Sequence, residues 1–268
     1  MSKYLTRFSN TKKNQLSLKV KSLLQGRNIK GKIGVCLPSY NESENICYLI
    51  NALLKQNLNI VICLVDDNSP DGTYNIVKNE FKKLINKKIF LILRKKKDGR
   101  GGACWEGLKF LKIKIKNIKI FVEMDCDFSH SIKDFKKGIQ IFDKNTDVLL
   151  GSRYPDGVII DWPLQRRIFS YFSNLLTRFL LSRKIHDYTN GFRFYNLKAV
   201  SIMIKKKPLN KGYIYLSETL SMFLKKKLII KSFPIKFVNR NRGQSNTNLN
   251  EIMSALTGII KIAINYRR

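Results

Sequence analysis

Two aspartates, separated by a single cysteine, are the clearest candidates for chemistry in this sequence. Asp125 and Asp127 follow the apolar run Ile118–Met124, which predicts a mostly buried strand. Two carboxylates at this spacing suit a hard divalent cation, and Mg²⁺ is usually held by one or two carboxylates together with the phosphates of a substrate. An Asp-x-Asp loop that only caps the next helix has the same pattern, so the metal interpretation depends on the rest of the chain.

Three earlier predicted strands also end in loops that bear acidic residues or glycines. They span Ile33–Leu37, Ile60–Val65 and Ile89–Leu93, and helical patterns lie between them. This alternation predicts βαβ units and a parallel sheet, because parallel neighbours need crossover connections. The carboxyl ends of parallel strands share one edge of the sheet, where open α/β sheets bind ligands. The loops that meet there contain Glu42, Asp66, Asp67, Gly99–Gly102, Asp125 and Asp127.

These elements imply an α/β fold with a mostly parallel sheet flanked by helices. Residues 1–31 are polar and basic, and we expect a disordered extension there, with a short amphipathic helix or a targeting segment as alternatives. A folded domain is expected from residue 32 to 268, and its first half, 32–152, is a nucleotide-binding type of α/β layer. Later elements are expected at Val148–Leu150 (strand), Leu164–Leu181 (helix), His186–Arg193 (loop), Leu216–Lys226 (helix), Leu228–Val238 (strand) and from about Glu251 (helix).

The charge of the chain is strongly positive, at +32 from 51 basic and 19 acidic residues. Such a surplus suits nucleic acid, an anionic membrane surface or a phosphorylated substrate. The lysines are spread over nearly all helices and loops, however, so solvated faces without a partner explain the surplus equally well. The five cysteines show no Cys-x-x-Cys spacing and are interpreted as reduced thiols. No apolar run has the ~20 residues that a membrane-spanning helix needs.

The glycine-bearing loop matches neither of two common nucleotide-binding signatures. Gly-x-x-x-x-Gly-Lys-[Ser/Thr] is absent, and the first strand-to-helix turn lacks Gly-x-Gly-x-x-Gly. Gly101 and Gly102 stand before a predicted helix, where backbone N–H groups can approach an anion. A tight turn between strand and helix explains the two glycines equally well.

Eight segments of the chain carry a joint pattern: Pro38–Glu42, Val65–Thr73, Gly99–Ala103, Asp125–His130, Gly151–Tyr154, Trp162–Arg167, Asp187–Tyr195 and Pro234–Arg240. Taken together, these segments resemble the inverting glycosyltransferases of the GT-A fold, family 2, and among them most closely the dolichyl-phosphate β-mannosyltransferases. Each motif is weak alone, but the set is specific and covers the chain from about Lys32 to its C-terminus. The resemblance implies a nucleotide-sugar-binding half at 32–152, an acceptor half at 153–250 and a C-terminal amphipathic helix at 251–268.

The resemblance also implies a donor site. Asp125 and Asp127 would hold Mg²⁺ or Mn²⁺ against the diphosphate of the donor, with the backbone of Cys126 close by. The family usually has alanine at the position of Cys126. The residues that would line the guanosine and ribose are Pro38, Tyr40, Glu42, Val65 and Asp67.

Arginines are the implied contacts of the phosphate groups. Arg153 and Arg240 would face donor and acceptor phosphates, and Arg166 and Ser170 would face the lipid phosphate. With Asp127, the residues Arg153 and Arg166 are the expected catalytic groups, because guanidinium groups suit bidentate capture of phosphate. Asn246 stands where the family commonly has a lysine, so the loop that would close on the donor keeps a hydrogen-bond donor and loses a cation.

The implied activity is transfer of mannose from GDP-mannose to dolichyl phosphate with inversion at the anomeric carbon. Its product, dolichyl β-D-mannosyl phosphate, supplies mannose for N-glycans, GPI anchors and O-mannosylation. A phosphate monoester has a second pKa near ~6, so the acceptor is mostly dianionic and needs no strong general base. His130 and His186 accordingly show no nucleophile partner and are interpreted as structural, with His130 near enough to orient the metal loop.

The isoprenoid tail of such an acceptor places the implied reaction at a membrane. The expected location is the cytosolic face of the endoplasmic reticulum, with peripheral contact and small membrane-anchoring subunits. The segment Ile252–Tyr266 and the basic surface are candidate contacts, although that segment would also suit packing on the core. The alternatives are a dolichyl-phosphate glucosyltransferase that uses UDP-glucose and a basic nucleic-acid-binding protein. No nucleic acid is expected, because RNP, zinc and helix-turn-helix signatures are absent.

Overall fold

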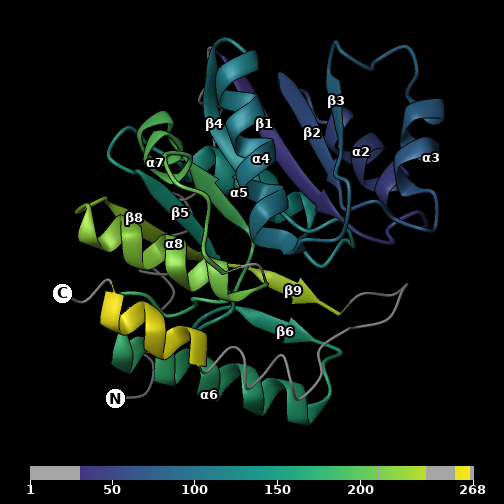
Figure 1. Ribbon diagram of the computed structural model, residues 1–268. Helices are drawn as coiled ribbons and strands as arrows, with labels where there is room; N and C mark the ends of the chain where they lie inside the picture. The colour runs from purple at the N-terminus through teal and green to yellow at the C-terminus, as the bar shows by residue number, and fades with distance from the viewer. Residues whose placement is uncertain (1–30, 211, 240–256, 266–268) are drawn as a thin grey trace, which may run out of the picture.

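The computed structural model describes residues 31–210, 212–239 and 257–265, arranged around a central sheet (Figure 1). The seven strands of this sheet have the order β3-β2-β1-β4-β7-β5-β8. β7 is antiparallel to both of its neighbours, and the other pairs are parallel. The strands are β1 (Lys32–Ser39), β2 (Ile60–Asp66), β3 (Ile89–Leu93), β4 (Ile118–Glu123), β5 (Val148–Ser152), β7 (Arg193–Tyr195) and β8 (Ile230–Pro234). The predicted α/β fold with a mostly parallel sheet is confirmed.

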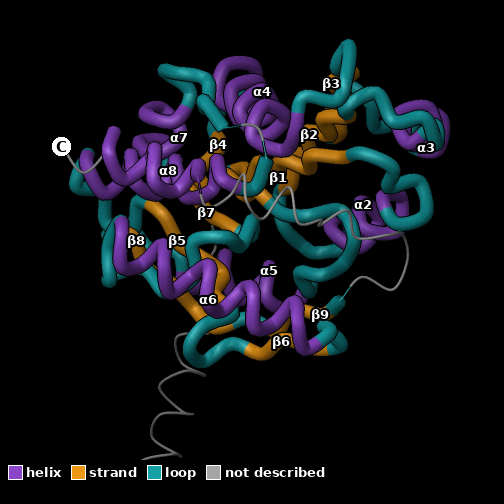
Figure 2. The backbone as a smooth tube through the Cα atoms, turned by 60° about the horizontal axis from the view of Figure 1, so that its bottom comes forward, coloured by secondary structure: helices purple, strands orange, loops and turns teal. Residues whose placement is uncertain are grey.

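Helices cover both faces of the sheet, as the two views in Figures 1 and 2 show. Strand β2 is buried along its whole length because its side chains alternate between two apolar clusters. Ile62 and Leu64 pack in the cluster of α2, α3 and α5, whereas Cys63 and Val65 pack in that of α4, α7 and α8. The helices are α2 (Ile46–Leu54), α3 (Thr73–Glu80), α4 (Gly99–Lys114), α5 (Ile132–Ile141), α6 (Leu164–Leu180), α7 (Leu197–Met203) and α8 (Ile214–Lys225).

The strand expected at Leu228–Val238 is wrong as a single element, because the chain changes sheets within it. β8 ends at Pro234, and β9 (Lys236–Val238) pairs instead with β6 (Val158–Ile160) in a separate two-stranded sheet. Ile235 lies at the crossing: its N–H donates to Ser152 O at 3.1 Å and its carbonyl accepts from Val158 N at 2.9 Å. One residue thereby links the main sheet to the small sheet that lies beside α6.

Helix α6 has its polar and apolar faces reversed relative to an ordinary surface helix. Ser170, Asn174 and Thr177 are buried against the fold. Leu164 and Phe179 near the two ends of the helix are 70% and 65% exposed. The other large apolar side chains that α6 exposes are Ile168, Tyr171, Phe172 and Leu175. The helix therefore presents an apolar stripe to solvent and turns its hydroxyl and amide groups inward.

Both ends of the chain lie partly outside the described residues. Apart from Gly31, the extension expected at residues 1–31 is outside them. The C-terminal helix expected at 251–268 is described as a helix over 257–265, with Ile259, Ile262 and Ala263 buried and Ile260 and Ile264 exposed. Among the described residues, no helix combines the length and apolar character needed to cross a bilayer.

Candidate active site

A cavity of about 170 Å³ brings together residues from both halves of the chain. Two carboxylates and two guanidinium groups line it, from Asp125, Asp127, Arg153 and Arg166. The aspartates follow β4, Arg153 follows β5, and Arg166 lies in the first turn of α6. The other lining residues are Ser129, Trp162, Phe169, Ser170, Ser173, Thr189, Asn190, Gly191, Tyr213, Ile214, Ser217, Phe237, Asn239 and Ile259. The cavity thus joins an acidic end to a basic and aromatic one.

The acidic end contains an arginine that sequence analysis did not select. Arg100, in the first turn of α4, forms ion pairs with Asp125 and with the fully buried Glu123, the latter at 3.0 Å. The same guanidinium group donates to Gly191 O at 3.1 Å. Burial alone would lower the pKa of Arg100, but the charges of Asp125 and Glu123 raise it well above its usual value. Arg100 therefore stays cationic and balances the carboxylates at the end of β4.

His130 holds the backbone of the aspartate loop in place. The N–H of Asp125 donates to Nδ1 of His130 at 3.3 Å, so Nδ1 is the unprotonated nitrogen. Nε2 then donates to Asn190 Oδ1, 2.9 Å away, and the ring stacks on Phe192. Burial lowers the pKa of His130 below its usual value, against the pull of Asp125. These contacts agree with the structural interpretation of His130; His186 does not line the cavity.

The aspartate loop fits a divalent cation whose coordination a substrate completes. Within the described residues, no group of three or more His, Cys, Asp or Glu side chains can hold a metal by itself. Asp127 Oδ1 accepts from Ser129 N at 3.0 Å, and the buried Ser129 Oγ has no partner among the described residues. Two carboxylates and an unpartnered hydroxyl beside a cavity suit Mg²⁺ or Mn²⁺, which bind few protein ligands and share substrate phosphates.

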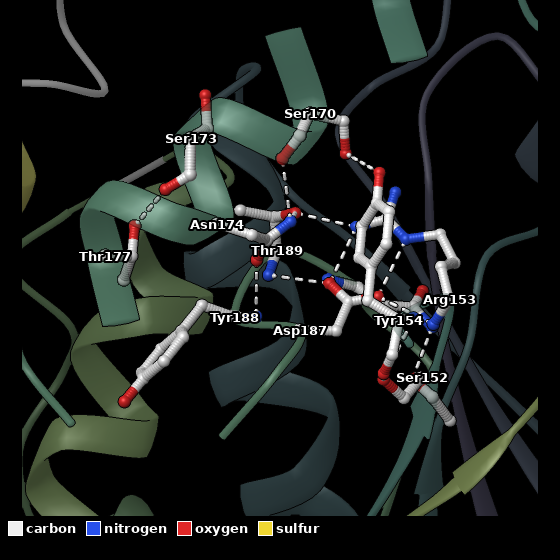
Figure 3. A network of polar contacts seen from close by, with 12 residues as sticks. Ser152, Arg153, Tyr154, Ser170, Ser173, Asn174, Thr177, Asp187, Tyr188 and Thr189 are labelled. Atoms are coloured by element: carbon white, nitrogen blue, oxygen red, sulfur yellow. Dashed lines mark hydrogen bonds and ion pairs between the residues drawn. The ribbon is translucent and has the colours of Figure 1, made fainter. Parts of the chain in front are cut away.

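Arg153 at the basic end is held almost rigidly by Asp187 (Figure 3). Its Nε and Nη2 donate to the two Asp187 oxygens at 2.8 Å each, and its backbone N–H donates to the same carboxylate at 2.9 Å. Nη2 also donates to Thr189 Oγ1 at 2.7 Å. Burial would raise the pKa of Asp187, but the adjacent Arg153 lowers it below its usual value. Among the described residues, none accepts from Nη1, which leaves that nitrogen for a ligand in the cavity.

Two further contacts complete the basic end. Arg166 Nη1 donates to Asn239 Oδ1 at 3.1 Å, and its guanidinium carbon lies 4.0 Å from the centre of the Trp162 ring. The hydroxyl of Tyr154 donates to Ser170 Oγ at 3.0 Å, which links the strand-end loop to α6. Sequence analysis missed Asp187, Tyr154 and Trp162 as site residues, although all three lie in the motifs that it quoted.

Comparison with known proteins agrees with this architecture. The model of the family Glycosyl transferase family 2 matches residues 34–202. A polyprenol monophosphomannose synthase of Mycolicibacterium smegmatis is 29% identical over 87% of this chain and 87% of its own length. An undecaprenyl-phosphate mannosyltransferase of Micrococcus luteus is 26% identical over 84% of this chain and 91% of its own. The chain belongs to glycosyl transferase family 2.

Solved structures of similar fold show the GT-A architecture that the strand order indicates. Mannosyl-3-phosphoglycerate synthase from Rubrobacter xylanophilus aligns with a TM-score of 0.63 at 16% identity, over 91% of this chain and 76% of that one. Glucosyl-3-phosphoglycerate synthase from Mycobacterium tuberculosis, solved with Mn²⁺, UDP and glucosyl-3-phosphoglycerate, aligns at 0.60 and 16% identity, over 90% and 82%. This chain is therefore a family 2 glycosyltransferase with the GT-A fold.

In this glycosyltransferase, the residues expected around the guanosine lie outside the lining of the cavity. Pro38 O accepts from the Cys126 thiol at 3.3 Å, which joins the first strand-end loop to the aspartate loop. Burial raises the pKa of that thiol well above its usual value, so Cys126 stays neutral. Tyr40 lies beneath Lys97 Nζ, 4.0 Å from the ring centre, and the Glu42 carboxylate accepts from Asn45 at 3.2 Å. Arg240 and Asn246 lie outside the described residues.

Asp67 and the glycine loop form a closed unit. Asp67 pairs with Arg94, and its Oδ2 accepts from the backbone N–H groups of Asp98 and Gly99 at 3.0 Å each. The anion at the start of α4 is thus a side chain of the protein itself. A Cβ at Gly102 would lie 2.5 Å from Arg94 Nη2, so this glycine permits close packing of the arginine. Gly101 and Gly102 lie inside α4, so the contact with Arg94 supports close packing at Gly102 and not the tight turn expected there.

Proposed function

We propose that this glycosyltransferase transfers mannose from GDP-mannose to a polyprenyl phosphate, dolichyl phosphate in particular, with inversion at the anomeric carbon. The observation on which the proposal rests is the single cavity that joins two carboxylates to two arginines. The carboxylates suit the metal-bound diphosphate of a donor, and the arginines suit the phosphate of an acceptor. The names of the two bacterial relatives, both enzymes of prenyl phosphate mannosylation, support the same sugar and acceptor class.

At the acidic end, Asp125 and Asp127 would hold Mg²⁺ or Mn²⁺. When bound, the cation would offset the negative charge that develops on the departing nucleoside diphosphate. The chain's own contribution is to fix the two carboxylates: Arg100 pairs with Asp125, His130 accepts from its backbone N–H, and Ser129 N–H donates to Asp127. Such fixed groups need no rearrangement as the sugar bond breaks.

The donor nucleoside would extend from the aspartates along the edge of β1 and β2. The residues proposed to line it are Pro38, Tyr40, Glu42, Val65 and Asp67, with the backbone of Cys126 next to the diphosphate. Arg240 would face the donor and acceptor phosphates, and Asn246 would belong to the loop that closes on the donor. The Cys126–Pro38 contact supports this route, because it places the metal loop against the first donor loop.

At the basic end, Arg153, Arg166 and Ser170 would bind the acceptor phosphate. Its dianionic oxygen is the nucleophile, so the residues around it need to orient it and to limit repulsion from the donor diphosphate. Arg153 is suited to this because Asp187 fixes its plane and leaves Nη1 toward a ligand. Such an acceptor needs no general base, so the proposed task of Asp187 beside Arg153 is to fix the guanidinium group and not to remove a proton.

The prenyl tail would leave the cavity toward the apolar stripe of α6. Phe169, Ile214 and Ile259 from three different helices line the cavity, and α6 exposes Leu164, Phe172 and other apolar side chains beside it. Exposed aromatic and aliphatic side chains on an amphipathic helix favour the interfacial region of a bilayer. We therefore propose peripheral contact with the cytosolic face of the endoplasmic reticulum membrane, aided by small membrane-anchoring subunits.

Transfer of label to lipid tests the proposal directly. Purified protein is incubated with radiolabelled GDP-mannose, dolichyl phosphate and Mg²⁺ or Mn²⁺, and the lipid phase is extracted. We expect label in the lipid, its loss with chelator, and a decrease of roughly 10²–10³-fold in Asp127→Ala. Asp156→Ala is the matched control, because Asp156 is exposed and does not line the cavity.

Three results would contradict the proposal. Transfer by Asp127→Ala at the wild-type rate would show that Asp127 has no role in the reaction. Preferential transfer from UDP-glucose would instead support the glucosyltransferase alternative, and steeply salt-dependent RNA or DNA binding without any transfer would support the nucleic-acid alternative.

A further inference from the structure

Trp162 lies close to both arginines of the cavity. The ring centre is 4.0 Å from the guanidinium carbon of Arg166 and 5.4 Å from that of Arg153. We propose that Trp162 is a positioning residue for an oxyanion site: its π system holds both guanidinium groups close enough for one phosphate to meet both. The assignment of that phosphate to the acceptor rests on the proposed function, whereas the pairing of the arginines does not.

Two guanidinium groups in one small cavity repel each other unless other groups offset their charge. Arg153 is neutralised by Asp187, which accepts from both its Nε and its Nη2 at 2.8 Å. The negative face of an indole ring attracts cations more strongly than that of phenylalanine or tyrosine. Trp162 can therefore offset part of the repulsion without adding a negative charge that would exclude an anion from the cavity.

The ring has little freedom to move away from the arginines. Trp162 is only 7% exposed, and its ring meets Phe237 edge-on with the centres 5.3 Å apart. Phe237, the middle residue of β9, has its ring centre 5.5 Å from the Arg153 guanidinium carbon. Tyr154 adds a third ring at 5.8 Å, so Arg153 is enclosed by aromatic faces.

Simple filling of space does not explain the choice of tryptophan at this position. The indole Nε1 of Trp162 is buried, and it has no hydrogen-bond partner among the described residues. An unsatisfied buried N–H is costly, and a phenyl ring or an aliphatic side chain would avoid it. The benefit that only an indole supplies here is its stronger attraction for cations, in agreement with the two guanidinium groups beside it.

The test changes the π system of Trp162 while it leaves the shape nearly constant. The chain has two tryptophans, so Trp105→Phe leaves Trp162 as the only indole. Growth on tryptophan analogues with one, two and three ring fluorines then weakens the negative face stepwise. The dissociation constants of inorganic phosphate and farnesyl phosphate are measured from the fluorescence of the remaining indole. Calorimetry replaces fluorescence for the most fluorinated form. Melting temperatures are measured in parallel.

We expect the dissociation constant of both phosphates to rise with each fluorine, to a total of roughly fivefold to tenfold, at a constant melting temperature. Trp162→Phe should give a similar loss, whereas the Trp105→Phe parent should bind as the wild type does, since Trp105 lies under Lys109 outside the cavity. Equal dissociation constants across the series would overturn the proposal and leave Trp162 as a packing residue.

The outcome separates this inference from the proposed function. Fluorine-dependent binding of both phosphates in a protein that transfers no mannose would support the oxyanion site and contradict the acceptor assignment. Mannosyl transfer with a fluorine-independent KM for the lipid phosphate would support the function and overturn the role of Trp162.

Discussion

Two buried arginine clusters lie at the same edge of the sheet, and they differ in the balance of charge. Arg94 is surrounded by carboxylates: it pairs with Asp67, with Asp98 at 3.3 Å and with Glu106 at 3.4 Å. Arg153 has one carboxylate partner, Asp187, and a second guanidinium group, that of Arg166, lines the same cavity. The carboxylates around Arg94 outnumber it, whereas Arg153 keeps one nitrogen, Nη1, without an acceptor among the described residues, beside a cavity.

The groups around each arginine indicate what its cluster does, whereas residue type and the net charge of the chain do not. Over the whole chain the surplus of +32 gives no information on a partner, because exposed lysines dominate it. Among buried groups the local balance is decisive, since an uncompensated buried charge is costly. A cluster in which carboxylates outnumber the arginine stabilises the fold, and one that keeps a guanidinium nitrogen available beside a cavity is suited to an anionic ligand.

The largest effect is expected on the free energy of unfolding, from breaking the cluster around Arg94. Asp67 and Arg94 are both only 6% exposed at their side chains, so Asp67→Asn removes the most buried of the three carboxylates around Arg94 and leaves the two more exposed ones, Asp98 and Glu106. Loss of one partner of such a pair lowers the free energy of unfolding by about 3–5 kcal/mol. Urea denaturation followed by circular dichroism measures it. Asp143→Asn is the control: its ion pair with Lys231 is largely exposed, and about 1 kcal/mol or less is expected.

The donor affinity of the same variant sharpens the comparison. Asp67 is also proposed to line the donor nucleoside, so the dissociation constant of GDP is measured well below the unfolding transition. An unchanged value would limit Asp67 to a structural role, and a raised one would support both roles. A free energy of unfolding equal to that of the wild type would contradict the interpretation of the cluster as a stabilising unit.

A change in the cluster around Arg153 should affect mainly the binding of the acceptor. Arg153→Lys keeps the charge but loses the planar fork that meets both oxygens of Asp187. We expect the KM for the lipid phosphate to rise roughly 10–100-fold, the value of one or two charge-assisted hydrogen bonds, with an unchanged KM for the donor. Arg167→Lys provides the control, because Arg167 is exposed and, among the described residues, its side chain donates only to Ile159 O, outside the cavity. Equal increases in both KM values would show that Arg153 does not distinguish the acceptor.

How far the sequence predicted the fold depends on the length of each apolar pattern. The strand expected at Ile89–Leu93 has these same bounds, and the helix expected at Leu164–Leu181 ends one residue earlier, at Leu180. Strand β7 was not predicted, because its three residues, Arg193–Tyr195, are too short to show a period and include a buried arginine. Its antiparallel insertion between β4 and β5 depends on contacts distant in the sequence, as does the change of sheets at Ile235.

The prediction of the site was limited in the same way, by contacts between residues that are distant in the sequence. Asp125, Asp127, Arg153 and Arg166 were selected from motifs, and all four line one cavity. Their partners were not predicted, because pairings such as that of Arg153 with Asp187, 34 residues away, leave no local periodicity. Arg100 was visible in the glycine loop, but nothing in the sequence indicated that it lies against Asp125 and Glu123.

The smallest expected effect separates a hydroxyl at the cavity from one outside it. Tyr154→Phe removes the hydrogen bond to Ser170 Oγ, and Tyr188→Phe removes a similar one of 2.9 Å to Ser182 O. Both should lower the free energy of unfolding by about 1 kcal/mol. Because Ser170 faces the cavity, only Tyr154→Phe should also raise the KM for the lipid phosphate, by roughly fivefold. Steady-state kinetics at fixed GDP-mannose measures this; an equal KM change in the two variants would mean that the Tyr154 hydroxyl stabilises the fold without orienting Ser170.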